Sequence, residues 1–149
     1  MNPWKCKKWK KFDEDYLQEG ILLTFETDVS PNIKDEFVQF SKWLINHFDF
    51  PVQLRVCLIN SERVKMRNGT LTYGIFKYYR KRYPIIIIPV GSGEHNWHIE
   101  EIFGSYVHEL THYFQWVNDY EQTDEASERQ ANYHRFRIVR NYYKDMGWD

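Results

Sequence analysis

Two histidines four residues apart, with a glutamate directly after the first, are the residues of this chain whose types and spacing point most clearly to chemistry. His108, Glu109 and His112 form an H-E-x-x-H sequence, and the chain's own residue frequencies give roughly 0.02 such matches by chance. On a helix, positions i and i+4 lie one turn apart on the same face, so both imidazoles can reach one zinc ion. Glu109 is rotated about 100° to the side. We therefore expect His108 and His112 to bind Zn²⁺ and Glu109 to act as general base on a zinc-bound water.

A catalytic zinc takes three protein ligands and keeps one position open for water, so a third ligand must come from elsewhere in the chain. The downstream candidates are Asp119, Glu121, Asp124, Glu125, Glu128 and His134. We predict Glu128, because the small Ala131 three residues later lets its helix approach the metal helix closely. Glu125 stands four residues before Arg129 in a first helical turn, where a surface ion pair explains it. Glu125 and His134 remain the alternatives for the third ligand.

Three acidic residues between the two predicted C-terminal helices have a different expected role. Asp119, Glu121 and Asp124 could accept a hydrogen bond from the far nitrogen of a zinc-bound histidine, the usual arrangement around such ligands. The sequence does not select one of the three.

The sequence of residues 108–112, followed by Glu128-Arg129-Gln130-Ala131-Asn132, resembles the short gluzincin metallopeptidases, especially the ImmA/IrrE type. In that type, H-E-x-x-H is followed by E-x-x-A-N on the next helix. The resemblance covers about 30 residues and implies a zincin-like fold in which His108, His112 and Glu128 bind zinc and Glu109 is the catalytic base.

The chain also departs from this family pattern. Thr111 stands where the family usually has Gly, and His134 and Arg135 stand where it usually has Phe and Ala. No helix-turn-helix segment accompanies the motif, so the regulatory role of the family does not transfer. The SprT type is a weaker match, because it uses a third histidine, which here only His134 could supply.

Such a site implies hydrolysis of a protein or peptide substrate. Three ligands with a net charge near -1 leave the zinc electrophilic, so its bound water ionises near neutral pH. Glu109 would take that proton and hand it to the leaving amine. We expect the substrate to pair with an exposed sheet edge beside the metal helix, for which Ile85 to Val90 is the nearest strand in sequence. Tyr133, His134 and Arg135 are candidates for oxyanion support.

Hydrophobic periodicity predicts the elements that position these residues. Ser30-Pro31 opens a helix, because the apolar residues from Ile33 to Phe48 recur at intervals of three and four. A second helix runs from about His98 to near Asn118, and a third from about Thr123 until Gly147 stops it. A short helix is also expected before Gly20.

Strands are predicted at 21–27, 52–60 and 85–90, with Asn68-Gly69 as a two-residue hairpin turn between 64–67 and 70–79. The predicted fold is α+β and zincin-like. It has a small twisted, mostly antiparallel sheet with an N-terminal helix, the H-E-x-x-H helix and a C-terminal glutamate helix, the helices packed on one face.

Length and composition indicate one domain spanning residues 1–149. Hydrophobic residues make up 42% of the chain and charged residues 28%, which is typical of a folded protein. Cys6 and Cys57 lack metal or redox spacing. We expect a reduced, cytoplasmic protein without membrane contact, because no apolar run approaches the roughly 18 residues of a membrane helix and the N-terminus lacks a signal peptide's apolar region. The sequence does not indicate the oligomeric state.

The net charge of -1 conceals an uneven distribution. No Lys or Arg lies between Arg82 and Arg129, whereas that interval holds nine acidic residues and four of the six histidines. This distribution favours a divalent cation and cationic substrate segments.

Two other functions are compatible with the sequence. One is a zinc-binding module that no longer cleaves anything, although such a module has no use for Glu109. The other is a nucleic-acid-associated protein that binds through the basic arm, residues 1–12, in which five lysines are interleaved with Trp4 and Trp9. A solvated tail, or an arm packed by its Trp residues, is the favoured interpretation of that arm. An arm that covers the cleft is a further alternative.

Overall fold

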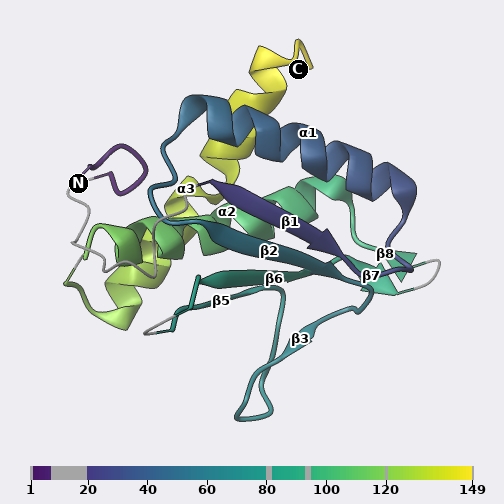
Figure 1. The fold of residues 1–149 in the computed structure, drawn as a ribbon, viewed down its shortest axis with the longest axis horizontal. Coiled ribbons are helices and arrows are strands. Elements are labelled where there is room, and N and C mark those ends of the chain that lie inside the picture. The colour runs from purple at the N-terminus through teal and green to yellow at the C-terminus, as the bar shows by residue number, and fades with distance from the viewer. Residues whose placement is uncertain (1, 8–19, 80–81, 93–94, 120, 149) are drawn as a thin grey trace.

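A computed structural model describes residues 2–7, 20–79, 82–92, 95–119 and 121–148 (Figure 1). In chain order the elements are β1 (Ile21–Phe25), α1 (Pro31–His47), β2 (Leu54–Ile59), β3 (Val64–Lys65), β4 (Leu71–Thr72), β5 (Ile75–Lys77), β6 (Ile85–Pro89), β7 (Gly91–Ser92), β8 (His95–Asn96), α2 (Ile99–Val117) and α3 (Asp124–Asp145). The three predicted helices from Pro31 onward are confirmed. The helix expected before Gly20 falls on residues outside the described ranges.

The main sheet is mixed, with the strand order β1-β2-β6-β5. β1 pairs with β2 and β2 with β6 in parallel, and only β5 pairs with β6 antiparallel. The prediction of a mostly antiparallel sheet is therefore wrong. β1 and β2 are parallel because α1 carries the chain from the end of β1 back to the start of β2, and such a helical crossover joins parallel strands.

The predicted hairpin forms, but with another turn and a shorter second strand. β3 and β4 pair antiparallel around Asn68-Gly69. A type I′ two-residue turn needs a positive φ at both central residues, but of Asn68 and Gly69 only Gly69 has one, +88°. The N–H of Gly69 donates to the carbonyl oxygen of Met66 at 2.9 Å. The predicted strand 70–79 is divided into β4, which stays in the hairpin, and β5, which joins the main sheet.

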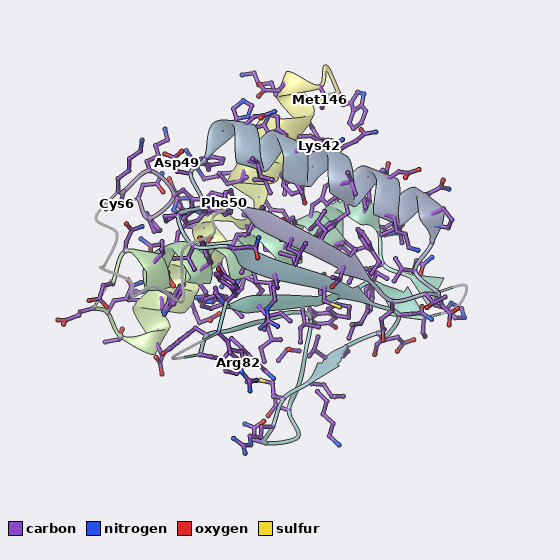
Figure 2. All side chains as sticks on the ribbon, in the orientation of Figure 1. Cys6, Lys42, Asp49, Phe50, Arg82 and Met146 are labelled. Carbon is purple, nitrogen blue, oxygen red and sulfur yellow. The ribbon has the colours of Figure 1, made fainter. Side chains whose placement is uncertain are left out.

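One face of the sheet carries the core. Side chains alternate along β2 and β6, so that Leu58 and Ile88 are fully buried under the helices. α1 and α2 pack against each other over this face, with the rings of Phe37 and Tyr106 stacked at 4.4 Å. Figure 1 shows the segment containing β3 projecting away from these layers, and Figure 2 shows the side chains that fill them, including Phe50, whose ring lies 5.2 Å from that of Phe114. The core therefore fixes α2 against the sheet.

The described part of the N-terminal arm is attached to α2. Trp4 is 3% exposed, and its Nε1 donates to Thr111 Oγ1 at 2.9 Å. Lys7 Nζ lies 2.9 Å from a carboxylate oxygen of Asp49. The predicted packing of the arm by its tryptophans is therefore seen for Trp4. Trp9 and the lysines at 8, 10 and 11 lie outside the described residues.

Within the described ranges, no helix has the length and apolar character needed to cross a membrane.

Candidate metal centre

The H-E-x-x-H residues lie in the middle of α2, at the border of its buried face. Tyr106, Leu110 and Tyr113 of the same helix are fully buried, which fixes the rotation of the helix. His108 and His112 then point toward α3, with side chains 15% and 16% exposed. The periodicity of the sequence thus places both imidazoles at the boundary between core and solvent.

His108, His112 and Glu128 form a group that could hold a metal ion. Each residue offers one ligand atom, and these atoms all lie within 4.8 Å of one another. The two carboxylate oxygens of Glu128 lie 3.1 Å from His108 Nε2 and 2.8 Å from His112 Nε2. Because ligand atoms about 2.1 Å from a tetrahedral zinc stand roughly 3.4 Å apart, small side-chain shifts are enough to admit the ion.

The alternative third ligands are not part of this group. Glu125 is exposed in the first turn of α3. His134 is buried, its ring lies edge-on to that of Tyr133, and burial together with the positive charge of Arg137 lowers its pKa. The group of His108, His112 and Glu128 is the metal-binding combination found within the described residues.

The hydrogen bonds of Gln115 determine which nitrogen of His112 carries its proton. Gln115 Nε2 donates to the carbonyl oxygen of Ser127 at 3.1 Å, which requires that Gln115 Oε1 is the end facing His112. His112 Nδ1 lies 2.8 Å from this oxygen, and the oxygen can only accept, so Nδ1 donates. In the neutral imidazole the lone pair is then on Nε2, the atom directed at Glu128, which is the tautomer that metal binding requires.

Gln115 and Ser127 thus take the place expected of the loop carboxylates. Ser127 Oγ donates to Gln115 Oε1 at 2.6 Å and lies 3.2 Å from His112 Nδ1. Because Gln115 and Ser127 occupy the far nitrogen of His112, the expectation that Asp119, Glu121 or Asp124 binds it is wrong. Gln115 lies three residues after His112 on the same helix face, so helical spacing alone could have identified it.

His108 is held in a form suited to metal binding. Burial lowers its pKa, the neighbouring His112 lowers it further, and the carboxylate of Glu128 opposes both effects. Its Nδ1 is buried and has no hydrogen-bond partner among the described residues. The neutral imidazole that these conditions favour is the form that coordinates a divalent cation.

Glu109 lies beside the group as a buried carboxyl. It is 8% exposed, and one of its oxygens is 3.8 Å from His108 Nε2. Burial, and then the charge of Glu128, raise the pKa of Glu109 to about 8, while Arg135 and a hydrogen bond from the backbone of Phe76 lower it. A Cβ at Gly74 would stand 3.2 Å from Glu109 Cγ, so this glycine leaves the space that the side chain fills.

The sheet edge beside α2 is β5 rather than the expected strand. β6 is paired on both sides, by β2 and β5, and so offers no free edge. β5 is the outer strand of the order β1-β2-β6-β5 and contacts α2. The backbone that meets Glu109 is that of Phe76 in β5, so the expectation that residues 85–90 supply the edge is wrong.

The three candidates for oxyanion support are separated by their positions on α3. Tyr133 is 60% exposed and lies under the guanidinium of Arg137. His134 is buried outside the metal-binding group. Arg135 faces α2, and its positive charge lowers the pKa of both His108 and Glu109. Of the three, Arg135 is the residue whose charge acts on the site.

Two cavities flank the metal-binding group along the contact between α2 and α3. One, of about 460 Å³, is lined by His112 and by Phe76, Tyr78, Trp116, Asp119 and Asp124 among others; we call it the acidic cavity. The other, of about 480 Å³, is lined by Ser105 and Arg135 and by Tyr73, Trp97, Glu101 and Phe136 among others; we call it the arginine cavity.

Sequence reasoning did not anticipate the partner of Thr111, the residue that departs from the family pattern. Thr111 Oγ1 accepts from Trp4 and donates to the carbonyl oxygen of Val107 at 2.9 Å. A hydroxyl at this position therefore connects the N-terminal arm to the helix that carries both histidines.

No protein-family model, curated protein or solved structure matches the chain, so the metal-binding group on two packed helices stands on its own geometry.

Proposed function

We propose that this protein is a zinc-dependent metallopeptidase of the gluzincin type. The observation that carries the proposal is that His108, His112 and Glu128 converge within 4.8 Å while Glu109 lies buried beside them. The H-E-x-x-H and E-x-x-A-N sequences on α2 and α3, which resemble those of the ImmA/IrrE type, support the same function. The donor set of two imidazoles and one carboxylate fits a catalytic zinc with an open fourth position.

The chain's own residues have distinct tasks in the proposed hydrolysis. A zinc ion held by the three side chains would polarise the scissile carbonyl and acidify a water molecule. Glu109 accepts the proton of the attacking water as the new C–O bond forms, and delivers it to the amine nitrogen as the C–N bond breaks. The backbone of β5, whose Phe76 hydrogen-bonds Glu109, is the edge along which an extended peptide can lie.

The acidic cavity supports a preference for cationic substrate segments. The rings of Tyr78 and Trp116 are stacked at 5.8 Å in its wall, and Asp119 and Asp124 contribute carboxylates. Aromatic faces and carboxylates both attract Lys and Arg side chains. This agrees with the absence of Lys and Arg between residues 82 and 129.

The decisive experiment measures zinc content and peptide hydrolysis in the same samples. We expect about one zinc per chain, and cleavage of a peptide library that a chelator abolishes and that is enriched in bonds near Lys or Arg. Glu109→Gln should keep the zinc and lose hydrolysis by about 10²–10⁴-fold, because it removes only the proton acceptor. Glu100→Gln, on the same helix but exposed and outside both cavities, is the matched control and should cleave normally.

Two outcomes contradict the proposal. A wild-type protein that binds zinc and cleaves no library peptide is the zinc-binding module without proteolytic activity. Equal hydrolysis by wild type and Glu109→Gln shows that the cleavage comes from another protein in the preparation or from another site.

A further inference from the structure

Arg135 forms no ion pair with a carboxylate in the described part of the chain, although its positive charge lowers the pKa of Glu109. Its Nε is buried and makes no hydrogen bond there, and Nη2 lies 3.5 Å from Ser105 Oγ, a long contact. A Cβ at Gly104 would stand 2.9 Å from that Nε, so this glycine gives the side chain its place against α2. A partly desolvated guanidinium with such weak partners is costly unless another group neutralises it.

The arginine cavity lies at the polar end of this side chain. The ring of Phe136 lies 5.4 Å from the guanidinium carbon, and Tyr73 and Trp97 meet edge to face at 5.5 Å in the same cavity. Glu101 is exposed at the cavity and forms no ion pair with this guanidinium in the described structure. Aromatic walls exclude water, and an ion pair formed between them is stronger than one at an open surface.

The distance from Arg135 to the metal-binding group matches a short piece of peptide. Arg135 follows Glu128 by seven residues on α3, which is about 10 Å along a helix. An extended peptide covers that length in about three residues, at roughly 3.3 Å each. A group held by Arg135 therefore belongs to a residue close to the scissile bond.

From these contacts we propose that Arg135 is a specificity-determining residue that binds a carboxylate of the substrate in the arginine cavity, within about three residues of the scissile bond. The guanidinium offers parallel N–H donors that match a carboxylate. The carboxylate is supplied either by the C-terminus of the peptide or by an Asp or Glu side chain. This inference rests on the proposed peptidase function, and it adds the direction in which the substrate lies, with cationic side chains in the acidic cavity and the carboxylate at the opposite end.

Binding measurements separate this inference from the question of hydrolysis. The probes are fluorescein-labelled forms of the library peptide that is cleaved fastest or, if none is cleaved, of an alanine heptapeptide. One pair of probes compares the C-terminal free acid with the C-terminal amide. A second series places Glu or Gln at each of the three positions on either side of the scissile bond, or of the central residue of the alanine heptapeptide. Affinity is measured by fluorescence anisotropy with zinc-loaded Glu109→Gln protein, which does not consume the probe.

We expect one carboxylate position to improve affinity by about 10- to 100-fold over its neutral counterpart, as charged hydrogen bonds of this kind do. A gain from the free acid identifies a C-terminal carboxylate, and a gain from Glu over Gln identifies a side chain. Adding Arg135→Gln should abolish the gain, and Arg135→Lys should keep part of it. Arg137→Gln is the matched control, because Arg137 is exposed two residues away from Arg135 and its substitution removes the same charge.

The proposal is overturned if the Glu109→Gln protein, with Arg135 intact, binds the free-acid peptide no better than the amide and the Glu peptides no better than the Gln peptides at every position. It is also overturned if Arg137→Gln reduces the gain as much as Arg135→Gln, since the effect is then one of net charge. Both results are independent of hydrolysis. The first needs no substitution at position 135, and zinc loading of the Glu109→Gln protein shows that its site is folded.

Discussion

At the scale of single residues, Glu128 joins the two histidines of α2. Its side chain is 56% exposed, whereas both imidazoles are largely covered, so the carboxylate reaches inward from the surface of α3. Each of its oxygens meets one imidazole nitrogen. The donor atoms of the three side chains therefore converge on one position that a divalent cation can occupy.

Replacement of Glu128 by Gln should weaken zinc binding by more than about 100-fold, because loss of a ligand exceeds the 10–100-fold cost of losing an outer hydrogen bond. The measurement is competition with a chelator of known zinc affinity. Glu125→Gln, three residues earlier on α3 and outside the group, should bind zinc as the wild type does. The reverse pattern would transfer the third ligand to Glu125.

At the scale of elements, buried hydrogen bonds connect the described part of the N-terminal arm to α2 and to the residue that follows it. Trp4 Nε1 donates to Thr111 Oγ1, and its ring packs 4.9 Å from Phe48 and 4.6 Å from Phe114. Asn118, just after α2, also donates to the carbonyl oxygen of Pro3. The arm therefore stabilises the same helix that presents the histidines.

Thr111→Val should lower the free energy of unfolding by about 1–3 kcal/mol, since it leaves the indole N–H buried without a partner. Urea unfolding followed by circular dichroism, with chelator present, measures this loss. The double change Trp4→Phe/Thr111→Val should cost less than the sum of the two single changes, because it removes donor and acceptor together. Strict additivity would show that the hydrogen bond contributes nothing to stability.

At the scale of the whole molecule, stability should depend on the protonation of buried groups. His134 is buried in α3, and burial lowers its pKa from the usual 6.5. The folded protein then binds fewer protons than the unfolded chain as the pH falls below 6.5. By linkage, the free energy of unfolding decreases in that range.

His134→Asn should therefore show a pH-dependent difference from the wild type. The stability of the wild type relative to the variant should be greatest at pH 7.5 and should shrink as the pH falls through 6.5 toward 5, because only the wild type acquires this unfavourable proton. Urea unfolding of both proteins at each pH, with chelator present, measures the difference in their free energies of unfolding. The contributions of His108 and Glu109 are the same in both proteins and cancel in this difference. A difference that is constant with pH would mean that His134 titrates normally in the folded state.

Local spacing was enough to predict the three helices from Pro31 onward and the placement of His108, Glu109 and His112 on one of them. The i, i+4 relation of His108 and His112 and the position of Glu109 between them follow from helical geometry, and the apolar residues of α2 fix which way that face points. The strand positions 21–25 and 54–59 followed from local β-branched and alternating patterns in the same way. These features depend on residues a few positions apart in the chain.

Only the tertiary structure decided the parallel pairing of β1, β2 and β6, the edge position of β5 and the partners of His112. Strand pairing depends on how α1 crosses the sheet, and the hydrogen bonds of Gln115 and Ser127 depend on how closely α3 packs on α2. The sequence alone proposed Glu128 among several carboxylates, and helix packing brought it to the histidines. Contacts between distant segments arise from the packing of whole faces, which no local spacing of residues determines.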